Sequence, residues 1–202
     1  MPSKFKIVQL IWVTFICALN AFAQNIQYGV LSYSGSGCPS NTVRFVHTED
    51  GREISLLFDQ FLVEASGNRP SEWSDMKNCS VSIPILVPQG YQATIFKIDY
   101  RGYVLTPVGG HAKLQISYQY SRRRGLVYTQ VFPGGKDENY LITNDLEARN
   151  IFWSQCAEKT VLKIDANLFG RGSHQGDLTY LSIDSSDLSL GIRYFLQLRP
   201  CH

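Results

Sequence analysis

Residues 188–198 read LSLGIRYFLQL, and an apolar side chain occupies every second position from Leu188 to Leu198. Alternation with a period of two is typical of a β-strand that buries one face. Similar alternation occurs at residues 54–63, 79–87, 114–120 and 162–168. Turn residues separate these runs at 34–37, 49–51, 88–90, 109–110, 133–135 and 184–187. The sequence therefore predicts an all-β fold, an antiparallel β-sandwich or flattened barrel.

Signals for other local structure are few. Residues 144–152 have the signature of one short helix, with Asn144 as its cap and Glu147 three residues later. Pro84 has no N–H to donate, so it predicts an edge strand or a bulge at its position. Residues 67–78 and 122–139 lack alternation, and we expect surface loops there.

The first residues have the three parts of a secretory signal peptide. Lys4 and Lys6 precede an apolar run of about thirteen residues, and Ala21-Phe22-Ala23 forms a small-residue cleavage site. The run is shorter than the roughly 20 residues that cross a bilayer. We expect residues 1–23 to be removed and residues 24–202 to form one secreted domain without a transmembrane helix. The expected location is extracellular, or periplasmic in a Gram-negative bacterium.

Four cysteines remain after cleavage: Cys38, Cys79, Cys156 and Cys201. An even number of cysteines in an oxidising compartment predicts two disulfides. Of three possible pairings, we favour Cys38–Cys79 and Cys156–Cys201, while the crossed pairings remain open. A metal site is the alternative, but no C-x-x-C spacing supports one, and we expect no metal.

The charge balance argues against nucleic acid as a partner. The full chain has 19 basic and 17 acidic side chains, and the signal peptide contains two of the lysines. The secreted domain is therefore close to neutral, without the positive excess that phosphate backbones require.

The sequence lacks the common catalytic motifs, including G-x-S-x-G, H-E-x-x-H, the P-loop and the dinucleotide-binding pattern. His111 follows two glycines and His174 lies within Gly172–Gly176, so either is a candidate base for a secreted hydrolase. Ordinary loop histidines are the favoured interpretation. We expect no cofactor and lean towards a protein that is not an enzyme.

The only run of like charge is Arg122-Arg123-Arg124, which follows Tyr118 and Tyr120. Arginines beside aromatic rings suit phosphate groups, sulfated glycans or an acidic partner. The alternative is a solvated hairpin turn that protects an edge strand. The candidate ligand contacts are His111, Tyr118, Tyr120, Arg122, Arg123 and Arg124. Tyr91, Tyr100 and Tyr103 are a further candidate platform for sugar rings, with core packing as the favoured alternative, and Asn78-Cys79-Ser80 matches a glycosylation sequon.

A series of short motifs extends along the whole secreted domain. They are GSGCP at 35–39, FDQF at 58–61, NCSV at 78–81, PQG at 88–90, DYRG at 99–102, GHA at 110–112, WSQC at 153–156 and the final Cys201. This order resembles the secreted domain-of-unknown-function family 4360 (DUF4360). The ending Leu198–His202 departs from the aromatic and basic residues expected before the last cysteine. The resemblance implies export and four paired cysteines, and it implies no reaction.

The leading hypothesis is a secreted, non-enzymatic binding or interaction module. Its partner would be a glycan, a component of the cell envelope or another protein. The alternatives are a secreted hydrolase that uses His111 or His174, and a protein that binds membrane surfaces through Arg122–Arg124.

Overall fold

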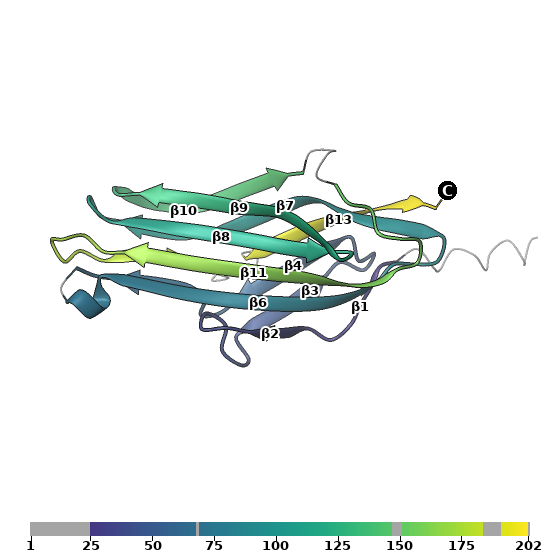
Figure 1. The fold of residues 1–202 in the computed structure, drawn as a ribbon, viewed down its shortest axis with the longest axis horizontal. Coiled ribbons are helices and arrows are strands. Elements are labelled where there is room, and N and C mark those ends of the chain that lie inside the picture. The colour runs from purple at the N-terminus through teal and green to yellow at the C-terminus, as the bar shows by residue number, and fades with distance from the viewer. Residues whose placement is uncertain (1–24, 68, 147–150, 184–190, 202) are drawn as a thin grey trace, which may run out of the picture.

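Two antiparallel β-sheets pack face to face in the computed structural model, which describes residues 25–67, 69–146, 151–183 and 191–201 (Figure 1). The first sheet has the order β1-β6-β11-β8-β9, with β2 also paired to β6. The second has the order β3-β4-β13-β7-β12-β5, with β10 paired to the other side of β7. The predicted all-β sandwich is therefore confirmed.

The strands of the first sheet are β1 (Gln27–Tyr28), β2 (Ser32–Ser34), β6 (Ser74–Leu86), β8 (His111–Tyr120), β9 (Arg123–Pro133) and β11 (Lys159–Arg171). Those of the second are β3 (Val43–His47), β4 (Glu53–Phe58), β5 (Leu62–Ala65), β7 (Tyr91–Thr106), β10 (Lys136–Asp145), β12 (Thr179–Ser182) and β13 (Ile192–Pro200). A single 3-10 turn, η2 (Pro70–Glu72), interrupts the described strands. Long strands of both sheets extend along the long axis of the molecule (Figure 1).

Alternate side chains of facing strands fill the space between the sheets. In β11, for example, Leu162, Ile164 and Leu168 are buried, and the residues between them face outwards. Three of the largest buried side chains, Tyr100, Tyr120 and Tyr194, lie in β7, β8 and β13. Removal of this apolar surface from water is the main force that holds the two sheets together.

Two of the predicted strands differ in their bounds from the strands in the structure. The run at residues 54–63 forms two strands, because β4 pairs with β13 whereas β5 pairs with β12, which contacts β7 further along its length. The final run begins at Ile192 as β13, and residues 188–190 lie outside the described residues. Pro84 lies in β6 between the residues that pair with β1 and those that pair with β2, so neither of these two short strands pairs with it.

Residues 67 and 69–73 connect β5 to β6 as expected, but the rest of the first expected loop and most of the second are strands, so the expectation was wrong there. Residues 74–78 extend β6 and pair with β11. Residues 123–133 form β9 in the first sheet, and residues 136–139 begin β10 in the second. Exposed side chains such as Met76, Val127 and Val131 lie on outer or edge positions. The apolar and polar residues therefore do not alternate there, and backbone pairing alone defines the strands.

The expected helix at residues 144–152 does not begin at its predicted cap. Asn144 and Asp145 end β10, and Asn144 pairs with Ile98 of β7. Residues 147–150 lie outside the described residues, and residues 151–155 have no regular structure.

Both disulfides have the favoured pairing. Cys38 bonds to Cys79 of β6, and Cys156 bonds to Cys201 directly after β13. The predicted signal peptide, residues 1–23, lies outside the described residues. Among the residues that are described, no helix has the length and apolar character needed to cross a bilayer.

Candidate functional site

A β-bulge turns one aromatic side chain out of the second sheet. Phe195 of β13 pairs with Lys97 of β7, but the next residue, Leu196, pairs with Ile95. Phe96 is therefore the extra residue of β7, and a bulge of this kind re-aims the side chain that it inserts. Phe96 is 36% exposed, whereas Ile95 is buried.

The hairpin turn between β3 and β4 faces this bulge. Asp50 accepts hydrogen bonds from the Thr48 hydroxyl (2.6 Å) and the Arg52 backbone N–H (3.0 Å). The Thr48 oxygen in turn accepts the Glu53 backbone N–H at 3.1 Å. The hydrogen bond from Thr48 is the main cause that lowers the pKa of Asp50 below its ordinary value. The carboxylate thus fixes the conformation of its own turn.

Two neighbouring segments hold this turn in place. The Ile26 N–H donates to the Asp50 carbonyl, and the Leu196 N–H donates to the Arg52 carbonyl at 2.7 Å. Gly51 has a φ of 69°, and a Cβ at this position would lie 2.3 Å from the Ile26 carbonyl oxygen. Only glycine fits there without strain. The turn is therefore preorganised against both β13 and the residue that precedes β1.

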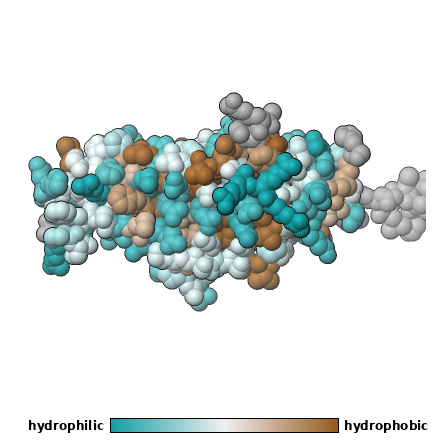
Figure 2. All heavy atoms as spheres, viewed as in Figure 1, coloured by the Kyte–Doolittle hydropathy of each residue, from teal (hydrophilic) through white to brown (hydrophobic). Residues whose placement is uncertain are grey.

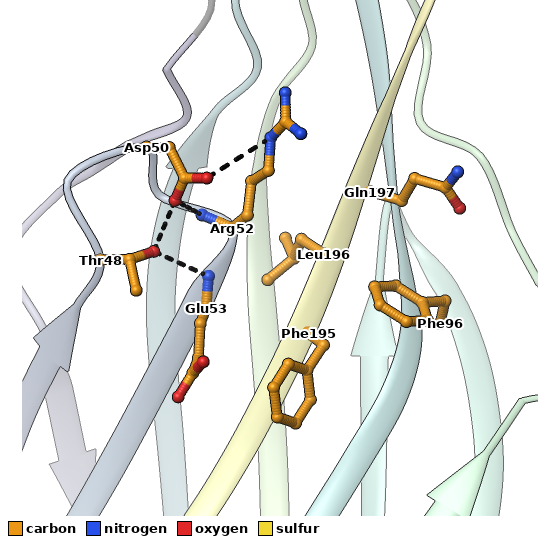
Figure 3. Close-up of a pocket in the computed structure, with 8 residues that line it drawn as sticks. All are labelled: Thr48, Asp50, Arg52, Glu53, Phe96, Phe195, Leu196 and Gln197. Atoms are coloured by element: carbon orange, nitrogen blue, oxygen red, sulfur yellow. Dashed lines mark hydrogen bonds and ion pairs between the residues drawn. The ribbon is translucent and has the colours of Figure 1, made fainter.

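Between the turn and the bulge is a cavity of about 500 Å³, hereafter the bulge groove. It is lined by Thr48, Asp50, Arg52, Glu53, Phe96, Phe195, Leu196 and Gln197. Figure 3 shows the charged residues of the turn on one side and the two phenylalanine rings on the other, with Leu196 between them. The volume lies within the roughly 300–1,000 Å³ of small-molecule sites.

The charges around the bulge groove are paired. Arg52 Nε lies 3.7 Å from Asp50, and Arg193 Nη1 lies 3.4 Å from Glu53. Lys97 lies 3.7 Å from the buried Asp99, and its Nζ also lies 4.7 Å from the centre of the Phe195 ring. The groove thus combines aromatic faces with hydrogen-bonding groups and little net charge.

The two candidate catalytic histidines lie apart from this groove. His111 is in β8 on the outer face of the first sheet, where its ring centre is 5.7 Å from that of Phe169. His174 follows β11, and its ring centre is 5.9 Å from that of Trp73. Within the described ranges, neither histidine forms a hydrogen bond with a carboxylate or a hydroxyl side chain.

The arginine run begins at a tight hairpin turn. Tyr120 pairs with Arg123, and the two residues between them, Ser121 and Arg122, have φ values of 49° and 59°. Positive φ at both positions is typical of a type I′ turn. Tyr118 and Tyr120 are buried, and burial raises the pKa of Tyr118 to about 12. Their rings therefore face the core rather than accompany the arginines at the surface.

The three candidate platform tyrosines do not share a surface. Tyr100 is buried and stacks on Tyr128, with ring centres 5.1 Å apart. The Tyr103 hydroxyl donates to Asp137 at 2.6 Å. The sequon residue Asn78 is exposed on β6, and its side-chain oxygen accepts the Ser36 hydroxyl at 2.9 Å.

The outer face of the first sheet has a mixed character. In Figure 2, which has this sheet in front, hydrophobic residues are interspersed with hydrophilic ones. Met76 and Val131 are exposed on it, and the Ser80 hydroxyl donates to Asp165 at 2.6 Å.

Sequence reasoning missed the bulge groove, although one signal was present. Phe195 occupies a position between the buried residues of its run, where the neighbouring outward positions are Arg193 and Gln197. An aromatic residue on the solvent side of a strand is a candidate ligand contact. The bulge at Phe96 depends on the pairing of two distant strands and has no comparable signal.

Known proteins provide limited comparisons. A relative from Arthroderma benhamiae, described as an uncharacterized secreted protein, is 28% identical over 160 residues, which are 79% of this chain and 65% of the relative. This chain thus spans just under two thirds of that relative's length.

Among solved structures, TmCBM61 in complex with β-1,4-galactotriose is 13% identical, with 85% of this chain and 88% of that chain covered and a TM-score of 0.26. The family 11 carbohydrate-binding module from Clostridium thermocellum, in complex with a mixed-linked tetrasaccharide, is 9% identical. That match covers 88% of this chain and 91% of the other, with a TM-score of 0.17. Structural similarity at these TM-scores gives no information about function.

The family model gives a clear result, because it matches residues 24–201, which is the whole expected secreted domain except its last residue. The resemblance noted in the sequence is therefore confirmed. The chain belongs to the family described as domain of unknown function (DUF4360).

Proposed function

We propose that the protein is an exported, non-enzymatic carbohydrate-binding module whose ligand occupies the bulge groove. The observation that carries the proposal is the arrangement of Phe96 and Phe195 opposite the hydrogen-bonded turn around Asp50. A sugar ring has C–H groups on its faces and hydroxyls around its rim. Aromatic rings suit the faces, and a few fixed polar groups suit the rim.

The rigidity of the groove supports a binding role. The turn is held by hydrogen bonds from Ile26 and Leu196, and the bulge is held by the ladder between β7 and β13. Preformed sites lose less conformational entropy when a ligand binds, so more of the contact energy appears as affinity.

Export is supported by the signal-peptide pattern and by the two disulfides. Disulfides persist in extracellular or periplasmic compartments and are rare in the cytosol. Polysaccharides of cell surfaces are abundant in the same compartments, so location and groove chemistry support one proposal.

A glycan array probed with the secreted, disulfide-bonded protein tests the proposal, followed by calorimetry with the glycans retained. We expect Phe195→Ala to weaken binding about tenfold or more, equivalent to about 1.4 kcal/mol. The matched control is Phe169→Ala, because Phe169 is also a half-buried phenylalanine but lies on the outer face of the first sheet. Retention of no glycan, or equal weakening by both variants, would contradict the proposal.

A further inference from the structure

The outward positions of β13 continue beyond the bulge groove towards the end of the chain. Phe195, Gln197 and Arg199 alternate with the inward-facing Leu196 and Leu198. Four residues of strand span about 13 Å. An oligosaccharide seated at Phe195 therefore reaches Arg199 when it extends along this strand for about that distance.

Arg199 is held in one orientation. Its guanidinium carbon lies 4.0 Å from the centre of the Trp153 ring, and its Nε donates to Gln92 at 3.0 Å. The Gln92 amide nitrogen in turn donates to the Ser154 carbonyl at 2.9 Å. Within the described residues, stacking on tryptophan and the hydrogen bond at Nε leave the two terminal nitrogens of the guanidinium without a partner.

The segment that contains Trp153 is itself fixed to β7. The Ser154 hydroxyl accepts the Ala93 N–H at 2.9 Å, and the Ser154 N–H donates to the Ala93 carbonyl at 2.8 Å. The disulfide Cys156–Cys201 then joins this segment to the residue two positions after Arg199. The hydrogen bonds of Ser154 and the disulfide therefore hold Trp153 and Arg199 next to each other.

Arg199 also differs from the cations around the bulge groove. Arg52, Lys97 and Arg193 each have a carboxylate within 4.0 Å. Within the part of the chain that the structure describes, Arg199 has no ion-pair partner. A fixed guanidinium whose two terminal nitrogens are available matches a carboxylate by two parallel hydrogen bonds.

We propose that Trp153, Arg199 and Gln92 form a subsite for an acidic sugar, with its carboxylate on Arg199. This proposal rests on the proposed function and specifies its ligand class: an oligosaccharide with a neutral sugar at Phe195 and a uronic acid towards Arg199.

NMR titration of the secreted, disulfide-bonded protein with sodium glucuronate tests the subsite. We expect the Trp153 indole signal to shift and saturate with glucuronate, and not to shift with glucose. The Trp73 indole, at the opposite end of the molecule beside η2, is the internal control (Figure 1). Arg199→Gln should weaken glucuronate binding at least tenfold, whereas Arg44→Gln, at an exposed ion pair on β3, should not change it.

Three results would overturn the subsite: no shift of Trp153 with glucuronate, unchanged binding in Arg199→Gln, or equal binding of glucose 6-sulfate. The first two remove the acid-binding role, and the third removes the selectivity for carboxylate. The failure of this inference is distinguishable from that of the proposed function. Glycan binding that depends on Phe195 but not on Arg199 would support the bulge groove and contradict the subsite. Glucuronate binding that persists in Phe195→Ala, with no neutral glycan bound, would support the subsite and contradict the bulge groove.

Discussion

At the scale of single residues, position relative to the two sheets decides what each aromatic side chain can do. Phe195 and Tyr194 are neighbours in β13, yet Tyr194 is completely buried while Phe195 lines the bulge groove. The same alternation buries Tyr118 and Tyr120 in β8. Residue type alone therefore did not identify the candidate ligand contacts, although the phase of the alternating pattern distinguishes these cases.

The burial of Tyr118 predicts a loss of stability at high pH. Burial raises its folded-state pKa from 10.0 to about 12, because the charged phenolate is disfavoured in the core. The stabilising contribution is complete below pH 10 and is lost as the pH rises from 10 through 12. We expect the free energy of unfolding, measured by urea denaturation, to fall over this interval, and to fall less in Tyr118→Phe. An identical pH dependence in both proteins would contradict this assignment.

At the scale of elements, connections between strands contain most of the features that the sequence did not predict. The β8–β9 connection was expected to be part of a loop, but it is a two-residue turn within a long hairpin. Gly125 permits this hairpin, because a Cβ there would lie 2.1 Å from Cζ of Tyr118. Close approaches of this kind depend on three-dimensional packing, so no local sequence pattern predicts them.

The same turn predicts a stabilising substitution. Arg122 has a φ of 59°, a conformation that costs a residue with a Cβ about 1–2 kcal/mol. Arg122→Gly should raise the free energy of unfolding by about 0.5–1 kcal/mol, after the greater chain entropy of glycine is subtracted. The control Arg124→Gly lies in extended β9 and should lower stability instead. Thermal denaturation compares the two variants, and a native-like or lower stability of Arg122→Gly would speak against the type I′ turn.

At the scale of the whole molecule, the sequence predicted the framework better than the site. The sandwich, the two disulfides and the principal strands follow from alternation and from the even number of cysteines. The disulfides close loops with sequence separations of 41 and 45. In the chain-entropy model each stabilises the fold by about 4 kcal/mol.

The bulge groove could not be predicted in the same way, because it joins residues that are far apart in the chain. The β3–β4 turn, the Phe96 bulge and Phe195 come from three separate segments, and only the register of β4, β13 and β7 brings them together. The turn at residues 49–51 was predicted, and Phe195 was visible as an aromatic residue on the outward side of its strand. Their proximity required the structure.

The most direct test of the binding role is a map of the backbone NMR signals that change when a glycan retained on the array is added. We expect the largest changes at Asp50, Phe96, Phe195 and Gln197, around the bulge groove. Changes confined to the outer face of the first sheet, around His111, Gln115 and Phe169, would place the ligand elsewhere and contradict binding in the bulge groove.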